Sequence, residues 1–276
     1  MSSAERILEY ISKKVTQQEE FLKKYPEYDG RGLLIAVIDI SHADASLPGL
    51  QKTTEGLPKI IDYFIFGEDE KVESSVIKEV DAENTLIGLS GRKLKIPLTW
   101  KNPSGKWHLG KKYFKDLFCK KDSDKDCKKS MQENLNISES NKDKTIIVDC
   151  IVWFDGEKWR ACINTTGDDD LENAKVLTNY SDEHEFGFIA EKISYCIKIQ
   201  NDGNLLELFI ANDDHGGTVA RIVAANSPGE PEKNGLAPGA QIVSMKVDGL
   251  PSLEKAVRLI SLLLTLQISF IAFKMY

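Results

Sequence analysis

Asp39 is the first residue whose type and position suggest catalysis. It directly follows a continuous apolar run, residues 33–38, which is typical of a strand buried on both faces in a parallel sheet. Open α/β sheets place their ligands and catalytic groups at the carboxyl ends of such strands. Asp39 is therefore a candidate catalytic acid.

A second constellation has the acid spacing of a calcium-binding loop. Acids occupy positions 1, 3, 5 and 12 of such a loop, but the sharp turn at position 6 needs a glycine and the chain has Cys127 there. A solvated charge run in a surface loop is the preferred interpretation. The four acids are Asp122, Asp124, Asp126 and Glu133.

Two further polar groups invite a metal interpretation. His42 lies next to Asp39 and Asp44 in the sequence, so it could complete a metal cluster or a makeshift dyad, although a surface turn is the commoner outcome. Residues 168–170 are three consecutive aspartates, which we expect in an acidic surface turn. His108 and His184 have no neighbouring pattern. We expect neither a metal nor a cofactor.

The elements that must position these residues fall into three parts. Residues 4–24 have the apolar spacing of an amphipathic helix. The middle of the chain alternates short apolar runs with turn signals at 155–156 and 202–203, so antiparallel strands are expected there. The runs are 60–65, 145–154, 157–163, 193–199 and 205–210, and the polar stretch 111–144 between them is expected to be a mobile surface loop. A parallel pattern then resumes, with helices at 217–225 and 253–264 and strands at 240–247 and 266–273.

Composition excludes several classes of function. The chain has 276 residues, 41% hydrophobic, and 36 Lys and Arg against 43 Asp and Glu give a net charge of −7. This balance argues against a nucleic-acid or anionic-membrane partner. No apolar run is long enough to span a bilayer. Five cysteines without a CxxC pair, and no apolar signal segment, favour reduced thiols and an intracellular, cytoplasmic protein. Cys150, Cys162 and Cys196 stand in strand patterns and are expected to be buried.

Several motifs resemble the tripeptidyl-peptidase II family of subtilisin-like serine peptidases. They include Asp29-Gly30-Arg31-Gly32 before the run to Asp39, Gly88-Leu89-Ser90-Gly91-Arg92, and Asn234-Gly235-Leu236-Ala237-Pro238-Gly239. The match covers most of residues 20–250. The resemblance implies an α/β fold with a subtilisin-like parallel sheet and flanking helices, incomplete and interrupted by a mainly antiparallel insert.

The same resemblance implies a catalytic triad in the order Asp, His, Ser. Asp39 matches the family's Asp-Thr-Gly motif, but Ile40 and Ser41 follow it, so the turn-permitting glycine is lost and the aim of the carboxylate is uncertain. The family's His-Gly-Thr-His-Val-Ala motif matches residues 215–220. Registered on Val219-Ala220, it puts Thr218 at the position of the catalytic histidine. We expect His215, about 4.5 Å away along a helix axis, not to substitute.

The family's serine and oxyanion asparagine motifs are expected beyond residue 276. The resemblance therefore implies a peptidase fragment that is inactive by itself, whose complete relatives remove tripeptides from peptide N-termini in the cytosol and form homo-oligomers. The alternative is a non-catalytic pseudoenzyme or assembly module. The expected organisation is a lead-in over 1–29, the first part of the subtilisin-like domain over 30–58, an insert over 59–210, and a truncated second part over 211–276.

Overall fold

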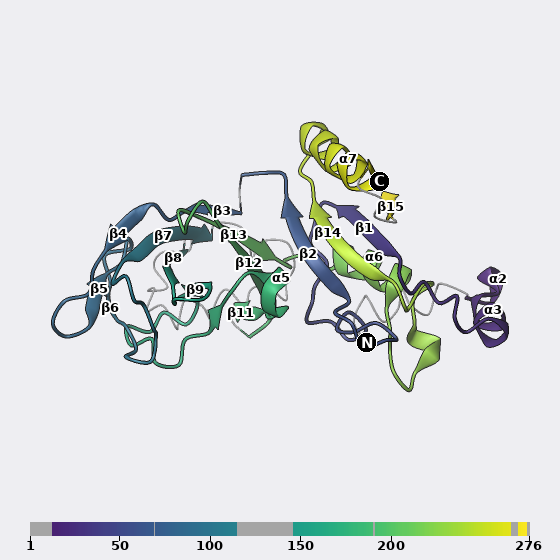
Figure 1. Cartoon of the computed structure of the whole chain (residues 1–276), viewed down its shortest axis with the longest axis horizontal. Coiled ribbons are helices and arrows are strands. Elements are labelled where there is room, and N and C mark those ends of the chain that lie inside the picture. The colour runs from purple at the N-terminus through teal and green to yellow at the C-terminus, as the bar shows by residue number, and fades with distance from the viewer. Residues whose placement is uncertain (1–12, 69, 115–145, 190, 266–269, 275–276) are drawn as a thin grey trace, which may run out of the picture. The chain divides into compact units, whose positions relative to one another are not determined.

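The computed structural model describes residues 13–68, 70–114, 146–189, 191–265 and 270–274 (Figure 1). The chain forms two compact units. One consists of Met1–Glu68 together with Ala211–Tyr276, and the other of Asp69–Ile210. The first unit holds both Asp39 and the helix that carries His215, so it contains the candidate site.

The first unit is built on a four-stranded sheet in the order β15-β1-β14-β2. Every neighbouring pair in it is parallel, which confirms the expected α/β class with a parallel sheet. Its strands are β1 (Leu34–Asp39), β2 (Ile60–Ile65), β14 (Gln241–Lys246) and β15 (Phe270–Lys274).

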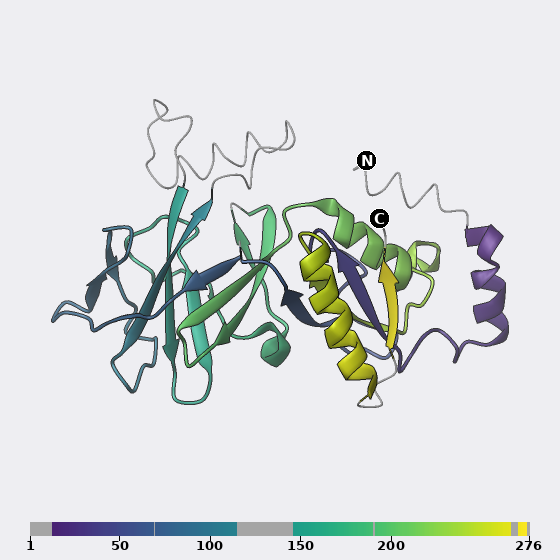
Figure 2. The same ribbon diagram turned by 90° about the horizontal axis from the view of Figure 1, so that it is seen from above.

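Two helices cover the faces of this sheet. Alternate residues of a strand point to opposite faces, so Ala36 and Ile38 share one face of β1. They pack with Met245 against the apolar side of α7 (Leu250–Thr265), including Ala256 and Ile260. The helix α6 (Asp214–Ala224) lies on the other side of β1 (Figure 2). Because both faces are covered, β1 is buried along nearly its whole length.

The expected N-terminal helix is described from residue 13 onward and is broken. It consists of α2 (Lys13–Thr16) and α3 (Gln18–Lys24), separated by Gln17 at φ 55°. The left-handed backbone at Gln17 interrupts the helical run. The predicted residues 4–12 lie outside the described part of the chain.

One strand belongs to a different sheet from the one expected. The sequence pattern places the run 60–65 in the antiparallel insert, but β2 pairs in parallel with β14, with Ser244 opposite Tyr63. The prediction of an insert beginning at residue 59 is therefore wrong at this boundary, and the second unit begins at Asp69. A short apolar run has the same pattern in either kind of sheet, so its partner cannot be deduced from it.

The second unit is antiparallel, as expected. A five-stranded sheet and a four-stranded sheet share one apolar core, in which Val148, Cys150 and Val152 meet Ile197 and Leu208. The first sheet contains β10 (Val176–Leu177), β9 (Trp159–Ile163), β8 (Ile146–Phe154), β7 (Trp107–Phe114) and β4 (Val76–Lys78). The second contains β11 (Gly187–Ile189), β12 (Ile193–Gln200), β13 (Leu205–Ile210) and β3 (Lys71–Glu73). A small hairpin of β5 (Thr85–Ile87) and β6 (Lys93–Lys95) and the short α5 (Tyr180–Glu183) complete the unit.

The predicted polar loop does not include residues 111–114. Residues 111–114 continue β7 and pair with the start of β8, so this part of the prediction is wrong. Residues 115–144 lie outside the described part of the chain, and so does the candidate calcium loop. Within the described residues, no helix combines the length and apolar character that crossing a bilayer requires.

Candidate active site

Asp39 ends β1 and is buried at the carboxyl edge of the parallel sheet. Its side chain is only 2% exposed. One carboxylate oxygen, Oδ1, accepts hydrogen bonds from the backbone N–H of Ser41 at 3.1 Å and from the Ser41 hydroxyl at 3.2 Å. The other oxygen, Oδ2, is thereby left to face the helix that follows the second unit in the sequence.

That helix, α6, begins immediately before His215. Asp213 is its N-cap, with extended backbone and a side chain that accepts a hydrogen bond from the His215 N–H at 2.8 Å. An aspartate in this role satisfies one of the N–H groups that a helix leaves unpaired in its first turn. The cap fixes His215 as the second residue of α6, at the end nearest the sheet edge.

The imidazole of His215 and the carboxylate of Asp39 are in direct contact. Nδ1 of His215 lies 2.7 Å from Oδ2 of Asp39. A carboxylate can only accept, so this contact places the proton of a neutral imidazole on Nδ1 and leaves Nε2 as an acceptor. The His215 side chain is 48% exposed, and within the described chain Nε2 has no hydrogen-bond partner. An imidazole held in this tautomer can take a proton from a hydroxyl nucleophile.

The structure therefore corrects the expected register of the histidine motif. The side chain that meets Asp39 is that of His215, and no hydrogen bond between described residues joins Asp39 to Thr218, which lies one turn further along α6 and is half-buried. The one-turn argument against His215 fails because it took Thr218 as the reference. The start of α6 at the Asp213 cap, a signal present in the sequence, points the imidazole at the carboxylate.

The loss of the motif's glycine does not misdirect Asp39. Neither Ile40 nor Ser41 has a positive φ, so the turn after β1 does not require glycine. Ser41 is 2% exposed, and its hydroxyl accepts a hydrogen bond from the N–H of Gly216 at 2.8 Å. The turn thus connects the strand that carries the acid to the helix that carries the imidazole. Sequence reasoning treated Ser41 only as a defect and missed this contact.

The segment behind the pair is anchored to the two neighbouring strands. The N–H of Ala43 donates to the hydroxyl of Ser244 on β14 at 3.0 Å, and the hydroxyl of Tyr63 on β2 donates to the Ala43 carbonyl at 2.9 Å. A Cβ on Gly216 would lie 2.5 Å from the Ser41 carbonyl oxygen. The first turn of α6 therefore packs so closely against this segment that a side chain at Gly216 would force a shift.

His42 occupies a different place from the one expected. It is fully buried, and its ring meets that of Tyr63 edge-on at 5.6 Å between centroids. The expectation of a surface turn is wrong, because the segment after β1 runs beneath α6. Within the described residues, no three His, Cys, Asp or Glu side chains converge on a metal-binding position, so His42, Asp39 and Asp44 do not form the cluster considered above.

The remaining candidates have structural environments. Asp169 pairs with Arg92 and Asp170 with Lys95, each at 2.7 Å, which agrees with the expected surface turn. Cys150, Cys162 and Cys196 are buried, as predicted. Burial raises the pKa of the Cys162 thiol to about 12, so it stays protonated at neutral pH and is a poor nucleophile.

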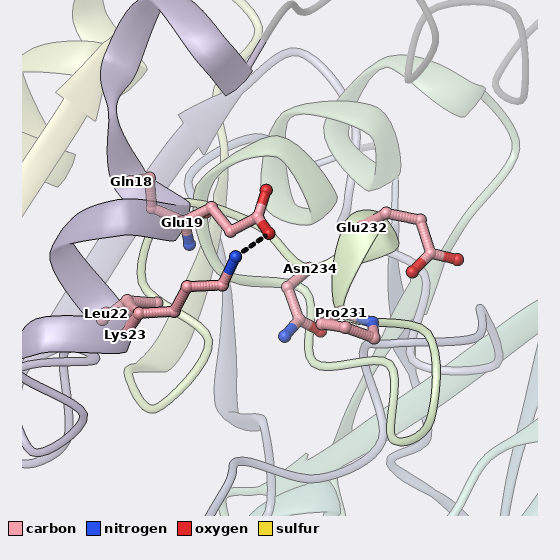
Figure 3. A pocket seen from close by; sticks show the side chains of 7 residues that line it. All are labelled: Gln18, Glu19, Leu22, Lys23, Pro231, Glu232 and Asn234. Carbon is pink, nitrogen blue, oxygen red and sulfur yellow. Dashed lines mark hydrogen bonds and ion pairs between the residues drawn. The ribbon is translucent and has the colours of Figure 1, made fainter.

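A pocket of about 360 Å³ lies elsewhere in the first unit, between α3 and the short helix η1 (Pro231–Lys233). Figure 3 shows Lys23 turned toward Glu19 inside it, and the two side chains form an ion pair of 2.7 Å. Gln18 attaches α3 to this region by donating to the carbonyl of Gly235 at 2.8 Å. The pocket is lined by Gln18, Glu19, Leu22, Lys23, Pro231, Glu232 and Asn234, none of which belongs to the Asp39–His215 pair.

Comparisons with known proteins identify the family that the chain resembles. The profile of the subtilase family matches residues 30–260. Tripeptidyl-peptidase 2 of Caenorhabditis elegans is 34% identical over 284 residues, covering 86% of this chain and 20% of the relative. The rice protein of the same name is 32% identical, covering 86% of this chain and 21% of the relative. The chain thus spans about a fifth of the length of these relatives.

A solved structure has the same fold. The crystal structure of tripeptidyl peptidase 2 matches with a TM-score of 0.62 at 23% identity, over 82% of this chain and 21% of that chain. The likeness extends across most of the described residues.

Proposed function

This chain belongs to the subtilase family, and we propose that it supplies the acid and the base of a serine peptidase site, Asp39 and His215. The observation that carries the proposal is the 2.7 Å contact between Nδ1 of His215 and Oδ2 of Asp39. Thr218 has no part in the site, so the chain keeps two members of the triad.

The proposed roles follow from the geometry. The buried Asp39 carboxylate holds the imidazole in the tautomer with its proton on Nδ1 and stabilises the imidazolium that forms when Nε2 takes a second proton. The exposed face of His215 leaves Nε2 accessible to a serine hydroxyl and to the leaving amine. The complete site needs, in addition, a serine hydroxyl at Nε2 and donors for the oxyanion.

We extend the proposal to the substrate by resemblance. The relatives' name implies release of tripeptides from peptides, so the completed site would act on peptide N-termini in the cytoplasm, within a homo-oligomer. The 276-residue chain alone should neither hydrolyse an alanine-alanine-phenylalanine chromogenic amide nor react with a fluorophosphonate, because among the described residues no serine hydroxyl is hydrogen-bonded to the His215 ring.

A chimera tests the roles of the two residues. In it, residues 30–260 replace the matching segment of an active tripeptidyl-peptidase, whose own serine and oxyanion donors are retained. We expect turnover without any change at Thr218. His215→Gln should reduce kcat on the order of a millionfold and Asp39→Asn by about ten-thousandfold, the scale of triad losses in subtilisin and related enzymes.

Thr218→Ala is the matched control and should change kcat by less than about tenfold, because its hydroxyl does not contact Asp39. If the folded chimera is inactive, or if Thr218→His is needed for turnover, the proposed catalytic role is wrong. A folded but inactive chimera would favour the assembly module instead.

A further inference from the structure

We propose that Ser41 is a positioning residue for the Asp39–His215 pair. Its hydroxyl connects the carboxylate of Asp39 to the first turn of α6, which carries His215. The catalytic meaning of this role rests on the proposed function, but the contacts themselves do not.

The hydroxyl of Ser41 uses both of its hydrogen-bonding capacities. It donates to Oδ1 of Asp39 at 3.2 Å and accepts from the N–H of Gly216 at 2.8 Å. A hydroxyl has one proton to give and lone pairs to receive, so both bonds form at once. The carboxylate is then fixed with Oδ1 toward Ser41 and Oδ2 toward Nδ1 of His215.

The bridge holds the two halves of the pair in register. Gly216 directly follows His215, and it is 175 positions away from Ser41 in the sequence. The contact therefore joins the end of β1 to the turn of α6 that carries the imidazole. In the sequence, the whole second unit lies between these two segments. Ser41 is 2% exposed, so water does not replace the hydroxyl without a local opening.

A second turn after β1 has the same local hydrogen bonds and allows the role of Ser41 to be compared with that of an ordinary turn residue. Asp44-Ala45-Ser46 repeats the Asp-x-Ser pattern, and Ser46 donates to Oδ1 of Asp44 from its N–H at 2.8 Å and from its hydroxyl at 2.6 Å. The local hydrogen bonds of the two turns are thus alike. What distinguishes Ser41 is the additional bond from Gly216.

The bridge is specific to this chain rather than to the motif it resembles. The family motif has glycine where this chain has Ser41, and glycine has no hydroxyl to link the strand with the helix. The substitution that the motif comparison registers as a loss thus adds a contact to the site.

The experiment observes His215 directly in the full 276-residue chain labelled with ¹⁵N-histidine. The readouts are the ring nitrogen shifts, which report the tautomer, and the rate at which the Nδ1 proton exchanges with water. In Ser41→Ala we expect this rate to rise by at least about tenfold, and the tautomer with the proton on Nδ1 to lose its dominance. Ser41→Thr, which keeps the hydroxyl, should retain both signals.

Ser46→Ala is the matched control, because it removes an equivalent hydroxyl-to-carboxylate bond five residues away. It should leave the His215 signals unchanged, and urea denaturation of each variant reports whether the fold is intact. If Ser41→Ala does not fold, Ser41→Gly, the residue of the family motif, decides the question by the same readouts.

An unchanged His215 in a folded Ser41→Ala or Ser41→Gly variant would overturn the proposal, as would an equal change in Ser46→Ala. The proposal would also be contradicted if a folded Ser41→Thr variant showed the same His215 signals as Ser41→Ala. These signals need no serine nucleophile, so an inactive chimera with Ser41-dependent His215 signals would remove the peptidase proposal and leave this one standing.

Discussion

The two ends of the parallel sheet in the first unit each bury a carboxylate near a basic group, but the basic groups differ in what they leave free. At the carboxyl end, Asp39 contacts an imidazole that is half exposed. At the amino end, Asp29 precedes β1 and Lys59 precedes β2, and the Lys59 side chain is completely buried. Its ammonium donates to the carbonyl of Pro238 at 2.6 Å and to that of Ala240 at 2.8 Å.

The difference separates a reactive arrangement from a structural one. The imidazole of His215 is half exposed and can exchange a proton with another molecule through Nε2, whereas the ammonium of Lys59 donates to two backbone carbonyls. A perturbed or buried charge is therefore not evidence of a site by itself. We expect changes at the amino end to alter the free energy of unfolding, and changes at the carboxyl end to alter the state of His215.

The largest effect on stability should come from Lys59→Ala. The substitution leaves a cavity and deprives the carbonyls of Pro238 and Ala240 of their donor, so we expect the free energy of unfolding to fall by about 4 kcal/mol in urea denaturation. Lys255→Ala, at an exposed position on α7, should change it by less than about 0.5 kcal/mol. The His215 ring signals should be the same in both. A loss at Lys59 below about 1 kcal/mol would contradict the structural role.

Gly216→Ala should affect both stability and the imidazole. The new Cβ would lie 2.5 Å from the Ser41 carbonyl oxygen, so α6 must shift, at a cost of about 2 kcal/mol. The shift should separate His215 from Asp39 and abolish the protected Nδ1 proton. In the control Gly217→Ala, the Cβ would come too close only to the end of the flexible Leu47 side chain, at 2.8 Å, with Asp44 at ordinary contact distance, and the helix gains propensity. A normal His215 signal in Gly216→Ala would show that the close packing is not needed.

The pH dependence of the free energy of unfolding should show that Lys59 is buried with a lowered pKa. Burial lowers the pKa of Lys59 to about 8 in the folded chain, below the usual lysine value of about 10.4. Between these values the unfolded chain binds more protons than the folded one, so this group makes the fold more stable as the pH rises. Relative to Lys59→Met, the natural chain should gain about 2 kcal/mol between pH 8 and pH 10. If the free energies of unfolding of the two proteins changed in parallel with pH, the lowered pKa of Lys59 would be wrong.

The sequence predicts the strand and the acid of the site well, because their signals are local. The apolar run before Asp39 specifies a buried strand, and its carboxyl end specifies where chemistry can occur. For the histidine, the motif register selects Thr218, whereas the side chain that contacts Asp39 is that of His215, and a local signal for it existed. Asp213 caps the helix two residues before His215, whereas the alignment relied on the apolar pair Val219-Ala220 further along.

Other features were beyond local reasoning. The parallel pairing of β2 with β14 joins segments that the whole second unit separates in the sequence, and the run 60–65 has no property that selects this partner. The bond from Gly216 to the Ser41 hydroxyl likewise depends on how α6 lies against the turn after β1. Hydrogen bonds between residues far apart in the sequence depend on how the elements pack. The sequence therefore shows the donor and the acceptor but not that they meet.

The smallest expected effect is that of Thr54→Val at the amino end. The Thr54 hydroxyl donates to Oδ2 of Asp29 at 2.6 Å, while Arg31 holds the same carboxylate through its backbone N–H and its guanidinium. Because these other donors remain and Thr54 is exposed, the loss should be about 1 kcal/mol at pH 7. His215 should not respond.

The pH dependence of this small loss tests its cause. Burial alone would raise the pKa of Asp29, but the hydrogen bonds from Arg31 and Thr54 outweigh it and lower the pKa. The stability that the charged carboxylate contributes is present above the usual aspartate pKa of about 3.9 and is lost as the pH falls through the lower folded value. The difference between Thr54→Val and the natural chain, measured by urea denaturation, should therefore shrink as the pH is lowered from 7 below about 3.9. A difference that stays constant over this range would mean that the methyl group, and not the hydrogen bond to a charged Asp29, accounts for it.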